Sequence, residues 1–212
     1  MDSFGLGLRE FWRRFRAPPD ALMLEIGAGG ELLVAKLRAI LSLALLLLPL
    51  TSIATGQYGP SQGIAGVFGV ILAVIASQLI LLLARQPHRF RWLPWLTTGY
   101  DITLTTLVLV LLALDSPAAS LNSMVAWAFY LVAICMTALR NDGRLTMYAG
   151  LLAMLQYGAL AAAVFALAEA PEELVSVDAG TVRAASVLQR LLLIGIVTAI
   201  MAAVVYRMQR LV

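Results

Sequence analysis

The sequence predicts an all-α polytopic membrane protein with six transmembrane helices and both termini in the cytoplasm. Three observations lead to this fold class: the composition, the number of long apolar segments and the placement of basic residues between them. Of the 212 residues, 61% are hydrophobic and only 13% are charged, whereas about 25% of the residues of a soluble domain are charged. A soluble fold of this size could not bury so much apolar surface, so we expect lipid to contact most of it.

A helix that crosses a bilayer needs roughly 20 mostly apolar residues, and six segments of the chain meet this requirement. They lie at about 33–54, 64–84, 93–114, 121–139, 145–168 and 187–207. Residues 33–207 are therefore predicted to form one six-helix transmembrane domain. Residues 208–212 would begin a cytoplasmic linker helix, and because the chain stops in mid-pattern without a helix breaker, we expect it to be a piece of a longer protein.

The basic residues support both the number of spans and their orientation. With six spans, 13 of the 15 Lys and Arg residues fall on one side, and the exceptions are Arg183 and Arg190. By the positive-inside rule that side is cytoplasmic. The opposite side receives the acidic connection 169–178. We therefore expect a multi-pass membrane protein.

The N-terminal segment 1–32 is predicted to be cytoplasmic and amphipathic. In residues 8–16, one helical face is apolar and the other carries arginines, as in helices that lie in the membrane interface. The apolar residues are Leu8, Phe11, Trp12 and Phe15. An ordinary basic anchor that only fixes topology is the alternative interpretation.

The residues that most enzymes and metal sites require are scarce. The single cysteine, Cys135, lies in an apolar run, and the single histidine, His88, lies in a basic loop. Histidine-based catalysis, zinc sites and phosphate-binding glycine loops all need patterns that this sequence lacks. We therefore expect no enzymatic activity and no cofactor in this segment. Nucleic acid is not an expected partner either, because the basic residues follow membrane topology.

Polar residues inside the predicted spans are the candidates for ligand binding, since each costs free energy there unless it is paired. Asp101 lies about two turns inside the third span, with Thr105 on the same face and Gln78 of the second span at similar depth. Four basic residues are open as partners of Asp101. They are Lys36, Arg38, Arg140 and Arg144. The group would form the floor of a ligand pocket, a switchable ion pair, or a structural pair that fixes helix register.

Three further candidates lie in the last two spans. Gln156 and Tyr157 are near the middle of the fifth span, where a glutamine either bonds a neighbouring helix or contacts a ligand's polar group. Arg190 opens the sixth span from the outer side and could bind an acidic ligand or a lipid headgroup. Alternatively, Arg190 forms a salt bridge with Asp115 or Glu169, or extends its guanidinium to the interface.

Two stretches resemble the six-helix membrane domains of bacterial class III adenylyl cyclases. Residues 101–107 match the D-x-T-L-x-T-L stretch of those domains. Arg144-Leu145 followed by residues 150–157 is similar to the start of their fifth helix. The similarity in helix arrangement extends over most of the chain, and the similarity in sequence motifs covers about 16 residues.

The resemblance implies a membrane receptor or anchor of the bacterial inner membrane that regulates a C-terminal cytoplasmic cyclase. It also implies a homodimer, and a lipid or other apolar ligand that binds among the helices. Two alternatives share this layout: the substrate-binding subunit of a vitamin-type transporter, and the sensory module of a diguanylate cyclase or histidine kinase. A plain anchor without a ligand is the simplest alternative.

Overall fold

The computed structural model describes residues 21–45, 47, 60–85, 90, 92–167, 175–176 and 180–209. The amphipathic helix predicted at residues 8–16 lies outside these ranges. Within them the chain is helical except for short connections and one small hairpin. The helices are α2 (Ala21–Leu45), α4 (Pro60–Ala84), α5 (Leu93–Asp115), α6 (Pro117–Asn122), α7 (Met124–Ala138), α8 (Gly143–Leu167) and α9 (Ala184–Gln209). Strands β1 (Val175–Ser176) and β2 (Gly180–Thr181) pair antiparallel before α9.

Three of the predicted spans are confirmed as helices of membrane-crossing length and composition: Leu93–Leu114, Gly143–Leu167 and Ala184–Gln209. The predicted second span, 64–84, lies within α4, and the fourth, 121–139, corresponds to the shorter helix α7. The first span was expected at 33–54, but α2 begins at Ala21. The predicted boundary between residues 32 and 33 therefore falls inside one continuous helix.

Local sequence signals set several helix ends. Pro94 lies in the first turn of α5, where its missing N–H costs nothing. α6 begins at Pro117, directly after Ser116 ends α5. The Ser123 side chain accepts a hydrogen bond from the Ala126 N–H and so caps α7. Helix α7 therefore begins at Met124, three residues after the predicted start of the fourth span.

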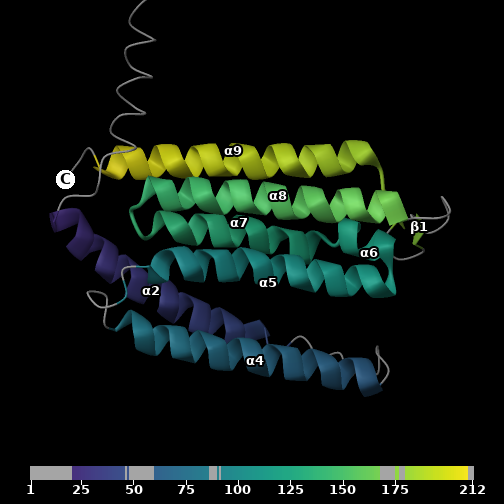
Figure 1. Ribbon diagram of the computed structural model, residues 1–212, viewed down its shortest axis with the longest axis horizontal. Coiled ribbons are helices and arrows are strands. Elements are labelled where there is room, and N and C mark those ends of the chain that lie inside the picture. The colour runs from purple at the N-terminus through teal and green to yellow at the C-terminus, as the bar shows by residue number, and fades with distance from the viewer. Residues whose placement is uncertain are drawn as a thin grey trace, which may run out of the picture.

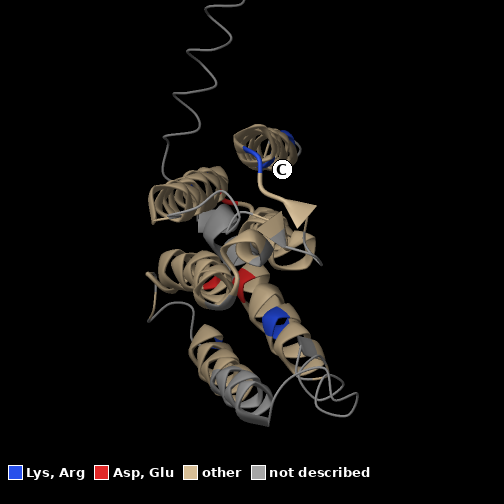
Figure 2. Cartoon of the chain, turned by 90° about the vertical axis from the view of Figure 1, so that its right-hand side faces the viewer, with Lys and Arg blue, Asp and Glu red and all other residues tan. Residues whose placement is uncertain are grey.

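The helices lie side by side in a bundle, with α9 and the α2/α4 pair on opposite sides of α5, α7 and α8 (Figure 1). The view turned by 90° agrees with this arrangement, and few of the helical residues drawn in it carry a charge (Figure 2). The beginnings of α2, α5 and α8 and the ends of α4, α7 and α9 share one end of the bundle (Figure 1). That end is called the α9-exit end below.

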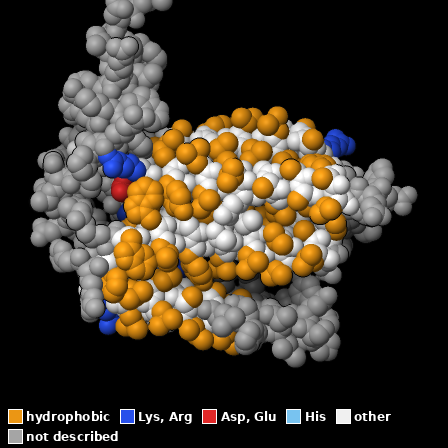
Figure 3. All heavy atoms as spheres, in the orientation of Figure 1, with side chains coloured by type: hydrophobic (Ala, Val, Ile, Leu, Met, Phe, Trp, Pro, Cys, Tyr) orange, Lys and Arg blue, Asp and Glu red, His pale blue; other side chains and the backbone are white. Residues whose placement is uncertain are grey.

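The outside of the bundle is apolar, and the charged side chains in view gather at its ends (Figure 3). Large hydrophobic side chains are exposed on every long helix. Examples are Ile40, Leu79, Leu111, Leu155 and Leu192. The inside is also apolar: Tyr130 and Tyr157 are fully buried among aliphatic residues of α5, α7, α8 and α9. A helix that is apolar all round fits a lipid environment better than water.

Helices α8 and α9 interlock at Gly150. A Cβ atom added at Gly150 would overlap the side chain of Thr198, whose hydroxyl donates a hydrogen bond to the Ile194 carbonyl at 2.7 Å. The bond holds the Thr198 rotamer, so this side chain cannot easily move away. Gly150 therefore permits the close approach of the two helices.

We expect Gly150→Ala to destabilise the folded protein by about 1–3 kcal/mol through overpacking, measured by thermal unfolding in detergent. Gly195→Ala is the matched control, because its added Cβ would lie 3.8 Å from the Met154 sulfur, an ordinary contact. The double variant Gly150→Ala with Thr198→Ala should regain only part of the loss, because it removes the Thr198 hydroxyl and methyl groups but keeps the Thr198 Cβ, 2.7 Å from the added atom. Equal stability of the two single variants would contradict the interlock.

Candidate functional site

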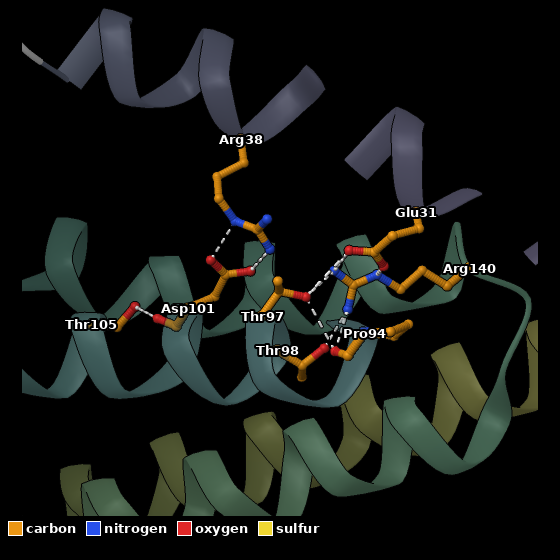
Figure 4. A network of polar contacts seen from close by, with 8 residues as sticks. All are labelled: Glu31, Arg38, Pro94, Thr97, Thr98, Asp101, Thr105 and Arg140. Carbon is orange, nitrogen blue, oxygen red and sulfur yellow. Dashed lines mark hydrogen bonds and ion pairs between the residues drawn. The ribbon is translucent and has the colours of Figure 1, made fainter. Parts of the chain in front are cut away.

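A network of buried charges joins α2 to the rest of the bundle at the α9-exit end (Figure 4). Glu31 and Arg38 are seven residues apart on α2, which places them on one face, two turns from each other. Both are buried, with 3% and 6% of their surfaces exposed. A buried charge is costly unless it is paired, so the partners of these two side chains define the site.

Arg38 pairs with Asp101 of α5 through two parallel contacts. Its Nε lies 2.7 Å from Oδ1, and its Nη2 lies 2.5 Å from Oδ2. Such fork-shaped pairing is among the strongest polar interactions available to side chains. Of the four partners that the sequence left open for Asp101, the structure selects Arg38. Thr105 lies one turn further along and donates its hydroxyl to the Asp101 backbone carbonyl at 2.9 Å.

Arg140, in the turn between α7 and α8, pairs with Glu31. Its Nε lies 2.7 Å from Glu31 Oε2 as an ion pair, although neither atom makes a hydrogen bond. Nη2 donates to Glu31 Oε1 at 3.3 Å and to the Thr97 hydroxyl of α5 at 2.8 Å, and Nη1 donates to the Pro94 carbonyl at 2.9 Å and to the Thr98 hydroxyl of α5. Arg140 thus connects α2, α5 and the α7–α8 turn (Figure 4).

Burial and pairing act against each other at Glu31 and Arg140. Burial raises the pKa of the Glu31 carboxyl, while Arg140 opposes this rise. Burial also lowers the pKa of Arg140 to about 10, against the effect of Glu31. A pKa of about 10 keeps Arg140 protonated at neutral pH. Each of the two acids in the network lies beside a base, so the formal charges of the four side chains balance, which is the condition for burying them together.

The backbone of α2 touches the α7–α8 turn directly at Gly30. A Cβ atom added there would overlap the Leu139 carbonyl oxygen and lie 2.9 Å from the Arg140 Cα. At the neighbouring Gly29 an added Cβ meets nothing within 4 Å. The glycine at position 30 therefore lets α2 approach closely enough for Glu31 to reach Arg140.

A small cavity of about 100 Å³ adjoins the Arg38–Asp101 pair. Ser42, Ser77 and Thr105 contribute hydroxyl groups to its lining. Gln78, which the sequence placed near Asp101, is exposed on α4, and its neighbour Ser77 is the residue that lines the cavity.

Gln156 belongs to a second polar cluster, between α5 and α8. Its Nε2 donates to the Thr103 hydroxyl at 3.1 Å, and its Oε1 lies 2.5 Å from the Thr106 hydroxyl. The Thr106 hydroxyl also lies 2.7 Å from the hydroxyl of Tyr130 on α7. A groove of about 500 Å³ extends from Gln156 and Thr106, and apolar residues of α5, α6 and α8 form the rest of its lining. This groove could hold an apolar molecule that carries a polar group.

Tyr157 and Arg190 lie elsewhere. Tyr157 is fully buried, with its ring edge-on to Tyr130 at a centroid distance of 6.1 Å. The Arg190 guanidinium lies 5.8 Å from the centre of the Trp127 ring and donates to the backbone carbonyls of Leu121 and Asn122 at the end of α6. The six candidates are thus distributed over several places: Asp101 and Thr105 belong to the ion network, and Gln156 to the groove.

Sequence reasoning missed Glu31 as a site residue and named Arg140 only as an alternative partner of Asp101. It also missed the hydroxyls of Thr103, Thr106 and Tyr130 around Gln156. Part of the signal was present: an acid and a base seven residues apart on an otherwise apolar helix share one face, and Thr97 and Asp101 share a face of α5. That pattern could have predicted two polar contacts between these helices.

The fold and site define an all-helical bundle with an apolar exterior, three helices able to cross a membrane, and a buried ion network at one end. Comparisons with protein-family models, with curated proteins and with solved structures found no match.

Proposed function

We propose that this chain is the membrane module of a signalling protein. In this proposal it crosses the bacterial inner membrane six times with both termini in the cytoplasm, forms a homodimer, and regulates a nucleotide cyclase domain that follows α9. An apolar or lipid ligand bound among the helices would change the regulation. The apolar exterior of the described helices supports the membrane location.

One observation carries the proposal: the two stretches that resemble cyclase membrane domains meet in the fold. Gln156, from the α8 stretch, contacts both Thr103 and Thr106, from the α5 stretch. Short apolar motifs occur often by chance, but residues far apart in the sequence that also bond each other act as one structural unit. The two stretches that carry the resemblance are therefore in contact in this fold, which supports the proposal.

The groove beside this contact supports the sensing part of the proposal. A ligand in the groove would touch both α5 and α8. Helix α8 in turn packs extensively against α9. The ligand can act only to the extent that it binds two arrangements of the helices with different affinity. Helix α9 is one continuous helix and would pass such a shift to whatever follows it.

A chimera tests the proposal: the chain is joined after Gln209 to the catalytic domain of a class III cyclase, and cyclic AMP formation is measured in membrane vesicles. We expect fractions of a total bacterial lipid extract to change the rate at least twofold. The matched control is Gln156→Leu, which removes the groove's amide and should abolish the response while leaving the basal rate in place. If no fraction changes the rate, the receptor function is refuted and only anchoring remains.

A further inference from the structure

The α7–α8 turn, residues 139–142, contacts two helices that lie on opposite sides of the bundle. On one side it receives α2, through the Gly30 backbone and the Glu31 carboxylate. On the other side it holds the end of α9, because the Gln209 side-chain amide donates to the Asn141 carbonyl at 2.8 Å. Gln209 is the last helical residue of α9.

Backbone hydrogen bonds make the α7–α8 turn a compact unit. Three successive backbone N–H groups, of Leu139, Arg140 and Asn141, bond to carbonyls three residues earlier. Asn141 has a φ of 53°, in the left-handed region that reverses the chain. Asp142 then accepts the Arg144 N–H and starts α8. Arg140 and the Asn141 carbonyl are adjacent in this tight turn, so a displacement of one changes the position of the other.

We propose that the α7–α8 turn couples the docking of α2 to the position of the α9 end. With α2 docked, the ion pair with Glu31 and the contacts with α5 hold Arg140, and the Asn141 carbonyl faces Gln209. When α2 moves away, Arg140 loses the charge that compensates its burial, the turn rearranges, and Gln209 is released. The coupling deepens the proposed function, on which its role in signalling rests, because it supplies a mechanical path from α2 to the exit of α9.

The chemistry of the α2 interface fits a two-state contact. Ion pairs at Glu31 and Arg38 join α2 to α5 and to the turn, while its extensive helix–helix packing is against α4. Apolar packing tolerates small shifts. A buried ion pair does not, because separating its two charges leaves each of them buried without a partner, which costs free energy. An interface of this kind therefore favours two distinct arrangements over a continuous range.

A spin label on α9 tests the coupling without any effector domain. The full chain, with Cys135→Ala to remove its native thiol, carries a nitroxide on Met208→Cys, and its spectrum is recorded in lipid nanodiscs. Gln209→Ala is expected to raise the mobile fraction of the label at least twofold. Gly30→Ala, which forces α2 off the turn, and Glu31→Gln, which removes its charge, should raise that fraction to the same level. Gly29→Ala is the matched control and should leave the spectrum unchanged.

Glu31→Asp keeps the charge but shortens the side chain, and serves as the second variant if Glu31→Gln does not fold. Coupling is refuted if Gln209→Ala mobilises the label while the Gly30 and Glu31 variants resemble Gly29→Ala. It is refuted equally if Gln209→Ala has no effect, because the hydrogen bond would then not restrain α9. Neither result depends on cyclase output, so a failed chimera and a failed coupling are distinguishable.

Discussion

Replacing Arg140 by glutamine is expected to destabilise the folded protein by about 3–5 kcal/mol, because the buried Glu31 carboxylate then has no opposite charge beside it. Arg140 also donates to the Pro94 carbonyl and to the hydroxyls of Thr97 and Thr98. A shorter, neutral side chain cannot reach all of these acceptors, so the loss includes several unpaired groups on α5.

The measurement is reversible unfolding of the purified protein in mixed micelles, followed by helical circular dichroism. Arg207→Gln is the matched control: it removes the same charge from an exposed position on α9, and its effect should stay within about 0.5 kcal/mol. If both variants unfold at the same denaturant concentration, the ion network does not contribute to the stability of the bundle.

The helices were the most predictable part of this protein. A run of about 20 apolar residues has few stable conformations other than a long helix, and the helices α5, α8 and α9 match their predicted spans within a few residues. Fifth-span residues Gln156 and Tyr157 were correctly placed in the interior of a helix for the same reason.

The start of α2 was not predictable by the same rule. Gly27, Gly29 and Gly30 precede Glu31, and each glycine costs a helix about 1 kcal/mol relative to alanine, so local propensity does not favour a helix through them. The structure compensates this cost through a tertiary contact: Gly30 allows α2 to touch the α7–α8 turn. That contact depends on a partner more than 100 residues away, which no local pattern reveals.

The sequence also could not predict which charged residues pair with each other in the site. Asp101 was identified as a costly group that needs a base, and Arg38 was one of four choices. Selecting among them requires the rotation of each helix about its axis, and helices that are apolar all round leave that rotation undefined. Glu31 was missed because it was assigned to the cytoplasmic segment, where a carboxylate needs no partner.

A double-mutant cycle on Arg38 and Asp101 should produce a large interaction energy. Asp101→Leu alone leaves the buried Arg38 guanidinium unpaired, and Arg38→Met alone leaves the carboxylate unpaired, so each is expected to cost about 3–5 kcal/mol. The double variant buries no charge and replaces the pair by apolar side chains. We expect it to be nearly as stable as the parent protein, because the desolvation of both ions is then no longer required.

The cycle is read from the same unfolding titration, with Thr105→Val as the matched control. Among the residues that the structure describes, the Thr105 hydroxyl bonds the Asp101 backbone carbonyl alone, one turn away, so its loss should cost less than about 1 kcal/mol. If the costs of the two single variants simply add in the double variant, the side chains do not interact. In that case α2 would be positioned by its packing against α4 and by Gly30 alone, and the charges would have to be explained by a role other than holding α2 to α5.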